Sequence, residues 1–253
     1  MNGWDAALVA AVTGMVTVMA VLRTPRSKAW VLVFPVPFTL ASLAVGTRLD
    51  ATHVAATGTT FLYTYLVWFA ATRLRVPLVA AIAVAVTSFL AVGTFAHAAL
   101  PRGDAPFWWA VAAVTVAGAV LHATLPVRDE IPRTRDLPIV VKVPLAALVV
   151  LGLVAIKGWI GGFMTMFPMV GVIASIENRE GLWSNVRRIP VVMVTMMPLM
   201  VTARLTEPHV GLFASLAIGW LPFLVALAVM SGAVGRWRPR WWRYGTPSRS
   251  GRV

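Results

Sequence analysis

The sequence lacks cysteine altogether and has few charged residues. The absence of cysteine excludes disulfides, thiolate metal sites, iron–sulfur clusters and a cysteine nucleophile. Only 12% of the 253 residues are charged, whereas 59% are hydrophobic. A water-soluble domain of this length has no interior large enough for so much apolar side chain, but a helix of about 20 apolar residues spans the hydrocarbon core of a bilayer. We therefore expect an all-α integral membrane protein.

Common signatures of catalysis are also missing. There is no glycine-rich phosphate loop, no Ser-His-Asp order and no pair of inward carboxylates. The four histidines (His53, His97, His122 and His209) show no spacing that would put two metal ligands on one helix face. The methionines of 164–169 and 191–200 favour adaptable packing over a Cu(I) site. We expect no metal and no cofactor.

Apolar runs between charged or Pro/Gly breaks predict about nine membrane spans. They are 6–22, 29–46, 54–72, 76–96, 106–125, 138–156, 159–176, 189–203 and 210–234. The chain then divides into a four-helix set at 1–98, a linker helix and cytoplasmic loop at 99–137, a second four-helix set at 138–234 and a basic tail at 235–253.

The distribution of basic residues predicts the orientation. With the N-terminus outside, seventeen of the 22 lysines and arginines fall in cytoplasmic segments, and only Arg48, Arg102, Lys157 and Arg204 fall in outer loops. The remaining one, Lys142, lies just inside a helix, where we expect it to snorkel to the cytoplasmic edge. This positive-inside bias predicts a multi-pass protein of the cell (inner, cytoplasmic) membrane, with its N-terminus outside and its C-terminus in the cytoplasm.

The C-terminal tail accounts for part of the net charge of +13. The stretch "GRWRPRWWRYGTPSRSGRV" holds six arginines interleaved with tryptophans and no acid. Such a segment favours anionic lipid headgroups as its partner, and we expect no nucleic acid. The remaining partners are a small-molecule substrate and, as an open alternative, a second copy of the chain in a homo-oligomer.

Two apolar segments share a pattern. When "AWVLVFPVPFTLASLAVG" (29–46) is set against "GGFMTMFPMVGVIASIEN" (161–178), Phe-Pro and Ala-Ser steps coincide at an offset of 133. Further on, "TRLRVP" (72–77) matches "ARLTEP" (203–208) at an offset of 131, each expected in the loop between the third and fourth helices of its set. With one linker helix between the sets, the second set is inverted in the membrane. The sequence thus predicts an inverted 4+1+4 repeat, which is typical of secondary transporters.

The proline in each segment bears on function. A proline removes a backbone donor and clashes with the carbonyl one turn earlier, and the freed carbonyl is tolerated only in protein or beside a wet cavity. Interruptions at equivalent positions of two repeats therefore favour a shared central site. The alternative is a pair of packing kinks, because proline is common in membrane helices.

The second four-helix set resembles a known family. The pattern "FMTMFPMVGVIASIENREG", followed by an apolar helix, "RLTEP" and a last apolar helix, is similar to the small four-helix GlpM-type inner-membrane proteins, which also carry a Phe-Pro step in the second helix ahead of a polar, charged turn. The resemblance covers roughly 140–230 and more faintly 10–95. It implies a four-helix membrane unit and assigns no substrate.

Candidate site residues are the polar, ionisable or interrupting residues within or at the edges of spans, because such groups are costly in hydrocarbon. The candidates are Pro35, Ser42, Tyr63, Thr64, His97, His122, Thr165, Pro168, Ser175, Glu177, Asn178 and Arg179. Glu177 is suited to pairing with a cation, carrying a proton or binding an amine, and its alternative is a solvated helix end. The histidines suit a proton relay or a simple interfacial position.

Two functions follow from these features. The first is a small secondary transporter or exporter of a small molecule, which is gradient-driven or needs an ATPase partner because no nucleotide-binding motif is present. The second is an integral membrane enzyme, or an accessory subunit of a biosynthetic (secondary-metabolite) pathway. Its polar site at the cytoplasmic mouth would be built from Glu177, Asn178 and Arg179, with His97 or His122 as an optional further member. A helical scaffold hosts either.

Overall fold

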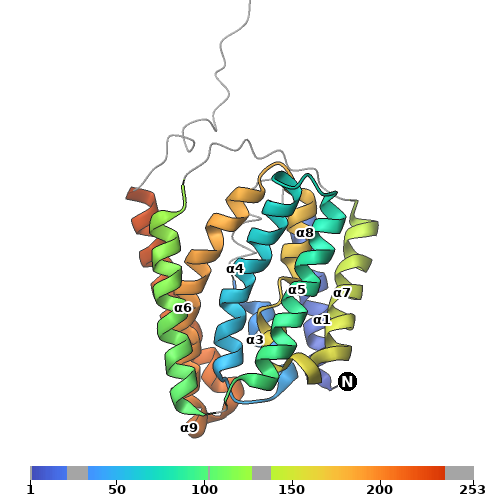
Figure 1. The fold of residues 1–253 in the computed structure, drawn as a ribbon. Coiled ribbons are helices and arrows are strands. Elements are labelled where there is room, and N and C mark those ends of the chain that lie inside the picture. Colours follow the sequence, from blue (N-terminus) through green and yellow to red (C-terminus); the bar gives the residue numbers. More distant parts are fainter. Residues whose placement is uncertain (1, 22–33, 102, 127–137, 237–253) are drawn as a thin grey trace, which may run out of the picture.

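The fold is all-helical throughout the part of the chain that the computed structural model describes, residues 2–21, 34–101, 103–126 and 138–236 (Figure 1). The α-helices are α1 (Gly3–Val21), α3 (Val36–Val45), α4 (Ala51–Thr72), α5 (Leu78–Ala99), α6 (Asp104–Thr124), α7 (Ile139–Ile160), α8 (Met169–Glu177) and α9 (Leu182–Arg236), and η1 (Gly161–Met166) is a short 3₁₀ helix. The all-α prediction is confirmed. Residues 29–33 of the predicted span 29–46 and residues 237–253 of the basic tail lie outside the described residues.

Five helical segments of the described chain are long and apolar enough to cross a membrane: Ala51–Thr72, Leu78–Ala99, Asp104–Thr124, Ile139–Met166 and Leu182–Ser231. Two shorter apolar helices, Gly3–Val18 and Val36–Val45, accompany them. Large apolar side chains point outward from these segments, such as Val79, Phe95 and Trp109, each about three-quarters exposed. Such a surface suits lipid rather than water.

Helix α9 is two helices joined at Gly211. This glycine has φ 77° and ψ 167°, a backbone conformation that side chains disfavour. A methyl group on Gly219 would lie 2.8 Å from the carbonyl of Leu199, twenty residues earlier, so the two arms of α9 fold back on each other (Figure 1). The predicted break was placed too early, because 203–208 is helical and the first arm continues to Val210.

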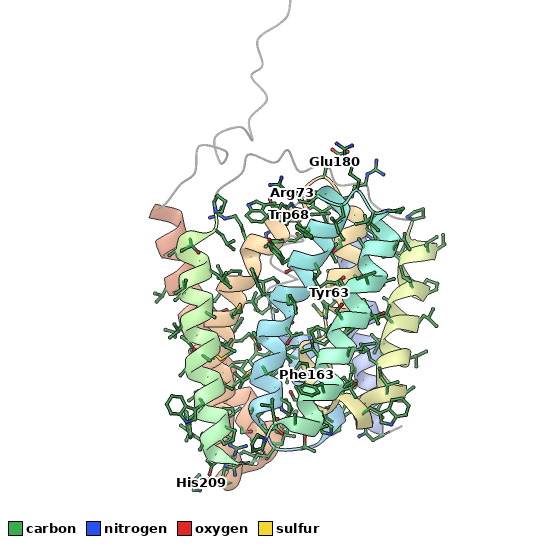
Figure 2. The ribbon with its side chains drawn as sticks, viewed as in Figure 1. Tyr63, Trp68, Arg73, Phe163, Glu180 and His209 are labelled. Atoms are coloured by element: carbon green, nitrogen blue, oxygen red, sulfur yellow. The ribbon has the colours of Figure 1, made fainter. Side chains whose placement is uncertain are left out.

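The bundle has two ends, named here after one residue of each. The Asp5 end holds the start of α1 and also His209, whereas Arg73 and Glu180 lie at the opposite, Arg73 end (Figure 2). Helices α1, α4, α6 and the second arm of α9 run from the Asp5 end to the Arg73 end (Figure 1). Helices α5, α7 and the first arm of α9 run the other way.

The stretch from Gly161 to Glu177 is an interrupted crossing. Helix α7 ends at Gly161 (φ 49°), η1 follows, and α8 begins after the Phe167-Pro168 step. The two glycines allow close approach, because a methyl group on Gly161 would overlap the ring of His97 and one on Gly162 would overlap His53 and the hydroxyl of Thr52. The apolar core closes around η1, with Phe163 and Phe167 both against Phe89 of α5 at centroid distances of 5.9 and 5.3 Å.

We predict that Gly162→Ala is destabilising because its methyl group has no room between α4 and η1. Overpacking of this kind costs about 1–3 kcal/mol, so the Tm in detergent should fall by several degrees. Gly152→Ala is the matched control, since nothing lies within 4 Å of its added methyl group. Equal melting temperatures for the two variants would contradict the close packing of η1 on α4.

Candidate functional site

The interruption at Phe167-Pro168 leaves a backbone carbonyl without its helical partner. The hydroxyl of Thr60 in α4 donates to the Met166 carbonyl at 2.8 Å. The amide of Met169 donates to the Phe167 carbonyl at 2.7 Å, which closes the turn around the proline. Thr60 is the tenth of the 22 residues of α4, so the interruption lies near the middle of the length of that helix.

A second helix also begins near the middle of the bundle. Pro35 is the N-cap of α3 and is buried. Near the start of α3, Trp220 donates from its indole nitrogen to the Thr39 hydroxyl at 3.0 Å, and Trp220 is the ninth residue of the second arm of α9 after Gly211. Helix α3 also packs on η1. The start of α3 and the interruption at Phe167-Pro168 are therefore neighbours.

The half-helices α3 and α8 start at this mid-level and run to opposite ends. The last turn of α3 lies at the Asp5 end, where the Ala44 carbonyl accepts from Lys157 at 3.1 Å. Helix α8 ends at Glu177, close to Glu180 at the Arg73 end (Figure 2). Each helix N-terminus carries about half a positive charge, so both positive ends face the middle of the bundle.

The hydroxyl candidates differ in what they bind. Ser42, Thr64 and Thr165 each donate to a carbonyl three or four residues earlier, so they stabilise their own turns. Ser175 does the same, donating to Gly171 at 2.8 Å. Tyr63 is different, because its hydroxyl is buried near Ser175 without meeting the geometry of a hydrogen bond. Tyr63 thus places a buried hydroxyl of α4 close to Ser175 of α8.

Glu177 forms a buried ion pair with Lys142 of α7. Lys142 is 1% exposed and Glu177 is 5% exposed. The prediction that Lys142 snorkels is therefore wrong, and so is the alternative of a solvated Glu177. Two opposite charges in an apolar interior attract strongly. Because Glu177 is distant from Lys142 in the sequence, the local pattern around Lys142 does not show this partner.

The predicted cytoplasmic mouth is only partly assembled. Asn178 caps its own turn by donating to the Gly181 carbonyl at 3.0 Å, whereas Arg179 is exposed. His122 lies in the last turn of α6, apart from the interrupted segments. Within the described ranges no cluster of three or more histidine, cysteine, aspartate or glutamate side chains is arranged to hold a metal ion.

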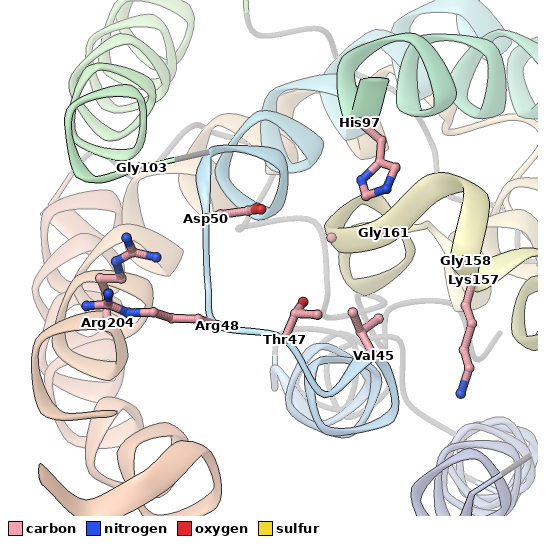
Figure 3. A pocket seen from close by; sticks show the side chains of 11 residues that line it. Val45, Thr47, Arg48, Asp50, His97, Gly103, Lys157, Gly158, Gly161 and Arg204 are labelled. Carbon is pink, nitrogen blue, oxygen red and sulfur yellow. The ribbon is translucent and has the colours of Figure 1, made fainter. Parts of the chain in front are cut away.

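An open hollow of about 650 Å³ lies at the Asp5 end and is called the Asp5-end hollow (Figure 3). Its charged and aromatic lining comes from Arg48, Asp50, His97, Lys157 and Arg204. Gly103, Gly158, Gly161 and Gly162 also line it, so part of its wall is bare backbone. The hollow reaches η1, which joins it to the interrupted crossing.

Asp50 is held by the helix that it caps. Its Oδ1 accepts from the Thr52 amide (2.9 Å) and hydroxyl (2.5 Å) and lies 2.9 Å from His53 Nδ1. Burial raises the pKa of Asp50, but the hydrogen bond and charge of His53 and the bonds from Thr52 lower it more, so the pKa lies well below its ordinary value. The carboxylate therefore stays ionised over the physiological range.

The cations of the hollow are held by acids. Lys157 contacts Asp5 at 2.7 and 2.8 Å, and Arg204 contacts Asp104 at 2.6 Å. Arg204 also donates to the Leu49 carbonyl. Sequence reasoning placed Arg48, Lys157 and Arg204 in the outer loops, and it counted only Arg48 among the ionisable candidates at the edges of spans. The predicted location of all three on the same side of the membrane was the sequence signal that indicated a shared site.

We predict that Lys142→Met strongly destabilises the protein, because it leaves the buried carboxyl of Glu177 without its cation. Breaking one side of a buried pair costs about 3–5 kcal/mol. The double variant Lys142→Met/Glu177→Gln should recover at least half of the loss in Tm. A double variant less stable than the single one would show that the two side chains are not coupled.

Thr60→Val should also destabilise, by about 1–3 kcal/mol, because the Met166 carbonyl then stays buried without a donor. Thr94→Val is the matched control, since the exposed Thr94 hydroxyl donates only to the Leu90 carbonyl of its own helix. The measurement is Tm in detergent for both variants. An equal loss in the two would mean that the bond between α4 and η1 contributes nothing.

Comparison with known proteins adds no relative. No protein-family model, curated protein or solved structure matches this chain. The resemblance to GlpM-type proteins therefore stays a prediction.

Proposed function

We propose that the protein is a small secondary transporter or exporter of the cell membrane, with nine crossings in an inverted 4+1+4 repeat. The observation that carries the proposal is the pair of half-helices that begin at Pro35 and Pro168 near mid-level and run to opposite ends. Half-helices with their N-termini at the membrane midplane are a recurrent way for transporters to build a substrate site. Each four-helix unit is proposed to be of the GlpM type.

Helix directions support the inverted repeat. The proposed equivalent pairs are α1 with α7, α4 with the first arm of α9, and α5 with the second arm of α9. Within each pair the two helices run in opposite directions (Figure 1). Helix α6 stands between the two sets in the sequence, as a linker helix must.

Aromatic contacts support the same alignment. Phe167 packs edge-to-face on Phe89 at 5.3 Å, and Phe34 stacks on Trp220 at 6.0 Å. The offset of 133 relates Phe34 to Phe167, and the offset of 131 relates Phe89 to position 220. The two contacts are thus equivalent under offsets obtained from the sequence alone. Chance similarity of apolar segments gives no reason for this agreement.

The distribution of charge supports the proposed orientation. Arg73, Arg75, Arg179, Arg187 and Arg188 belong to turns and helix starts at the Arg73 end, which we assign to the cytoplasm. The Asp5 end, with its basic residues paired to acids, faces outward. The enzyme alternative has less support, because Glu177 is paired inside the bundle while Arg179 points away from it.

Alternating access is tested by thiol labelling, for which the natural chain is suited because it has no cysteine. Thr165→Cys lies beside the interruption and is buried here. A transporter exposes this position to water from both sides in turn, so a membrane-impermeant thiol reagent should label it in right-side-out and in inside-out vesicles. Pro168→Ala restores a backbone donor and should reduce labelling from one side by at least fivefold.

Three single-cysteine controls set the limits of this experiment. Thr47→Cys should react only from outside and Arg179→Cys only from the cytoplasm, because both are exposed at opposite ends. Phe95→Cys, on an apolar outer face, should react from neither. Labelling of Thr165→Cys from one side alone would sink the transporter proposal in favour of a one-sided site, and exchanged results for Thr47 and Arg179 would reverse the orientation.

A further inference from the structure

Two arginine side chains come together at one side of the Asp5-end hollow. In Figure 3 the side chain of Arg48 extends toward Arg204, with His97 and Lys157 on the other side of the opening. The charges of Arg48 and Arg204 also both act on the carboxyl of Asp104. Two guanidinium groups from different parts of the chain thus share one small region.

Both arginines keep N–H donors that the protein does not use. The Arg48 side chain is 47% exposed, and its contact with Glu207 is 3.6 Å, longer than a hydrogen bond. Arg204 is 6% exposed, and its Nε is buried without a hydrogen-bond partner. That nitrogen is closed to the hollow, so the exposed N–H groups of Arg48 are the donors that an acceptor in the hollow can reach.

The wall of the hollow favours a negative ligand. It presents three permanent cations, Arg48, Lys157 and Arg204, against the single carboxylate of Asp50. That carboxylate is occupied by Thr52 and His53, as described above. The acids that neutralise the cations do not line the hollow.

We infer that the Asp5-end hollow binds a small anion through a carboxylate or phosphate group, held by the exposed guanidinium of Arg48 beside that of Arg204. The planar guanidinium fork matches the oxygens of either group. This assignment names the cargo class of the transporter and rests on the proposed function in that respect. Binding itself is measured without transport.

The acids beside the two arginines act as competitors of the ligand. Asp104 is 70% exposed and occupies one edge of Arg204 at 2.6 Å. An anion that enters the hollow either displaces Asp104 from part of the Arg204 guanidinium or binds between the guanidiniums of Arg48 and Arg204 while Asp104 stays in place. Removal of the Asp104 charge should therefore strengthen anion binding, whereas it would weaken the binding of a cation. This difference in sign separates the two classes of ligand.

The experiment is calorimetric titration of the purified full chain in an uncharged detergent at low ionic strength. The probes are succinate, inorganic phosphate and the diamine putrescine. We expect at least one anion to bind and putrescine not to bind. Arg48→Gln should weaken the binding of the anion at least tenfold, and Asp104→Asn should strengthen its binding about threefold or more. Arg75→Gln, exposed at the Arg73 end, is the matched control and should leave binding unchanged.

The outcomes are distinguishable. Binding of succinate alone assigns a carboxylate ligand, and binding of phosphate alone assigns a phosphate ligand. Absence of anion binding to the natural chain, binding of putrescine, or equal effects of Arg48→Gln and Arg75→Gln would overturn the inference. Tm values confirm that each variant is folded, and Arg48 is exposed enough to be replaced without loss of the fold. Two-sided labelling of Thr165→Cys with no anion binding would refute the anion site and leave the transport proposal standing.

Discussion

Every helical interruption inside a membrane has to satisfy its backbone within the protein, because hydrocarbon offers no hydrogen bonds. At the Phe167-Pro168 interruption the hydroxyl of Thr60 supplies the donor for the Met166 carbonyl at 2.8 Å. The bond fixes the height of the interruption against α4, and with it the starting level of α8. The close packing of the Gly161-Gly162 pair on α4 and α5 serves the same need. If η1 lay farther from α4, the Met166 carbonyl would have no hydrogen-bond donor.

Electrostatics completes what this hydrogen bond begins. Helix α7 carries a lysine near each of its ends, and each binds the last turn of a different half-helix: Lys142 the carboxylate of Glu177, and Lys157 the carbonyl of Ala44. The C-terminus of a helix carries partial negative charge, so a cation is favourable at both places. One continuous helix thereby holds two half-helices that point in opposite directions.

The sequence predicted those features that depend on local pattern. Apolar runs located the helices, and the two Phe-Pro steps located the start of α3 and the start of α8. Features that depend on distant partners were missed or misplaced. Lys142 was predicted to lie at a helix edge because its partner Glu177 is distant in the sequence and leaves no local pattern near Lys142. The stretch 203–208 looked like a loop because Glu207 and Pro208 resemble a break, yet Arg204 is buried against Asp104 and Leu49 and the helix continues. Tertiary contacts overrode local preference there.

The turn at Gly211 has a mechanical consequence. A single residue joins the two arms of α9, whereas five residues, from Arg73 to Pro77, join α4 to α5. A one-residue hinge stores no spare chain length, so the two arms cannot slide along each other by even one helical turn, while the longer connection leaves α4 and α5 free to do so. The single residue at Gly211 thus limits the relative movement of the two arms of α9 more than the five residues from Arg73 to Pro77 limit that of α4 and α5.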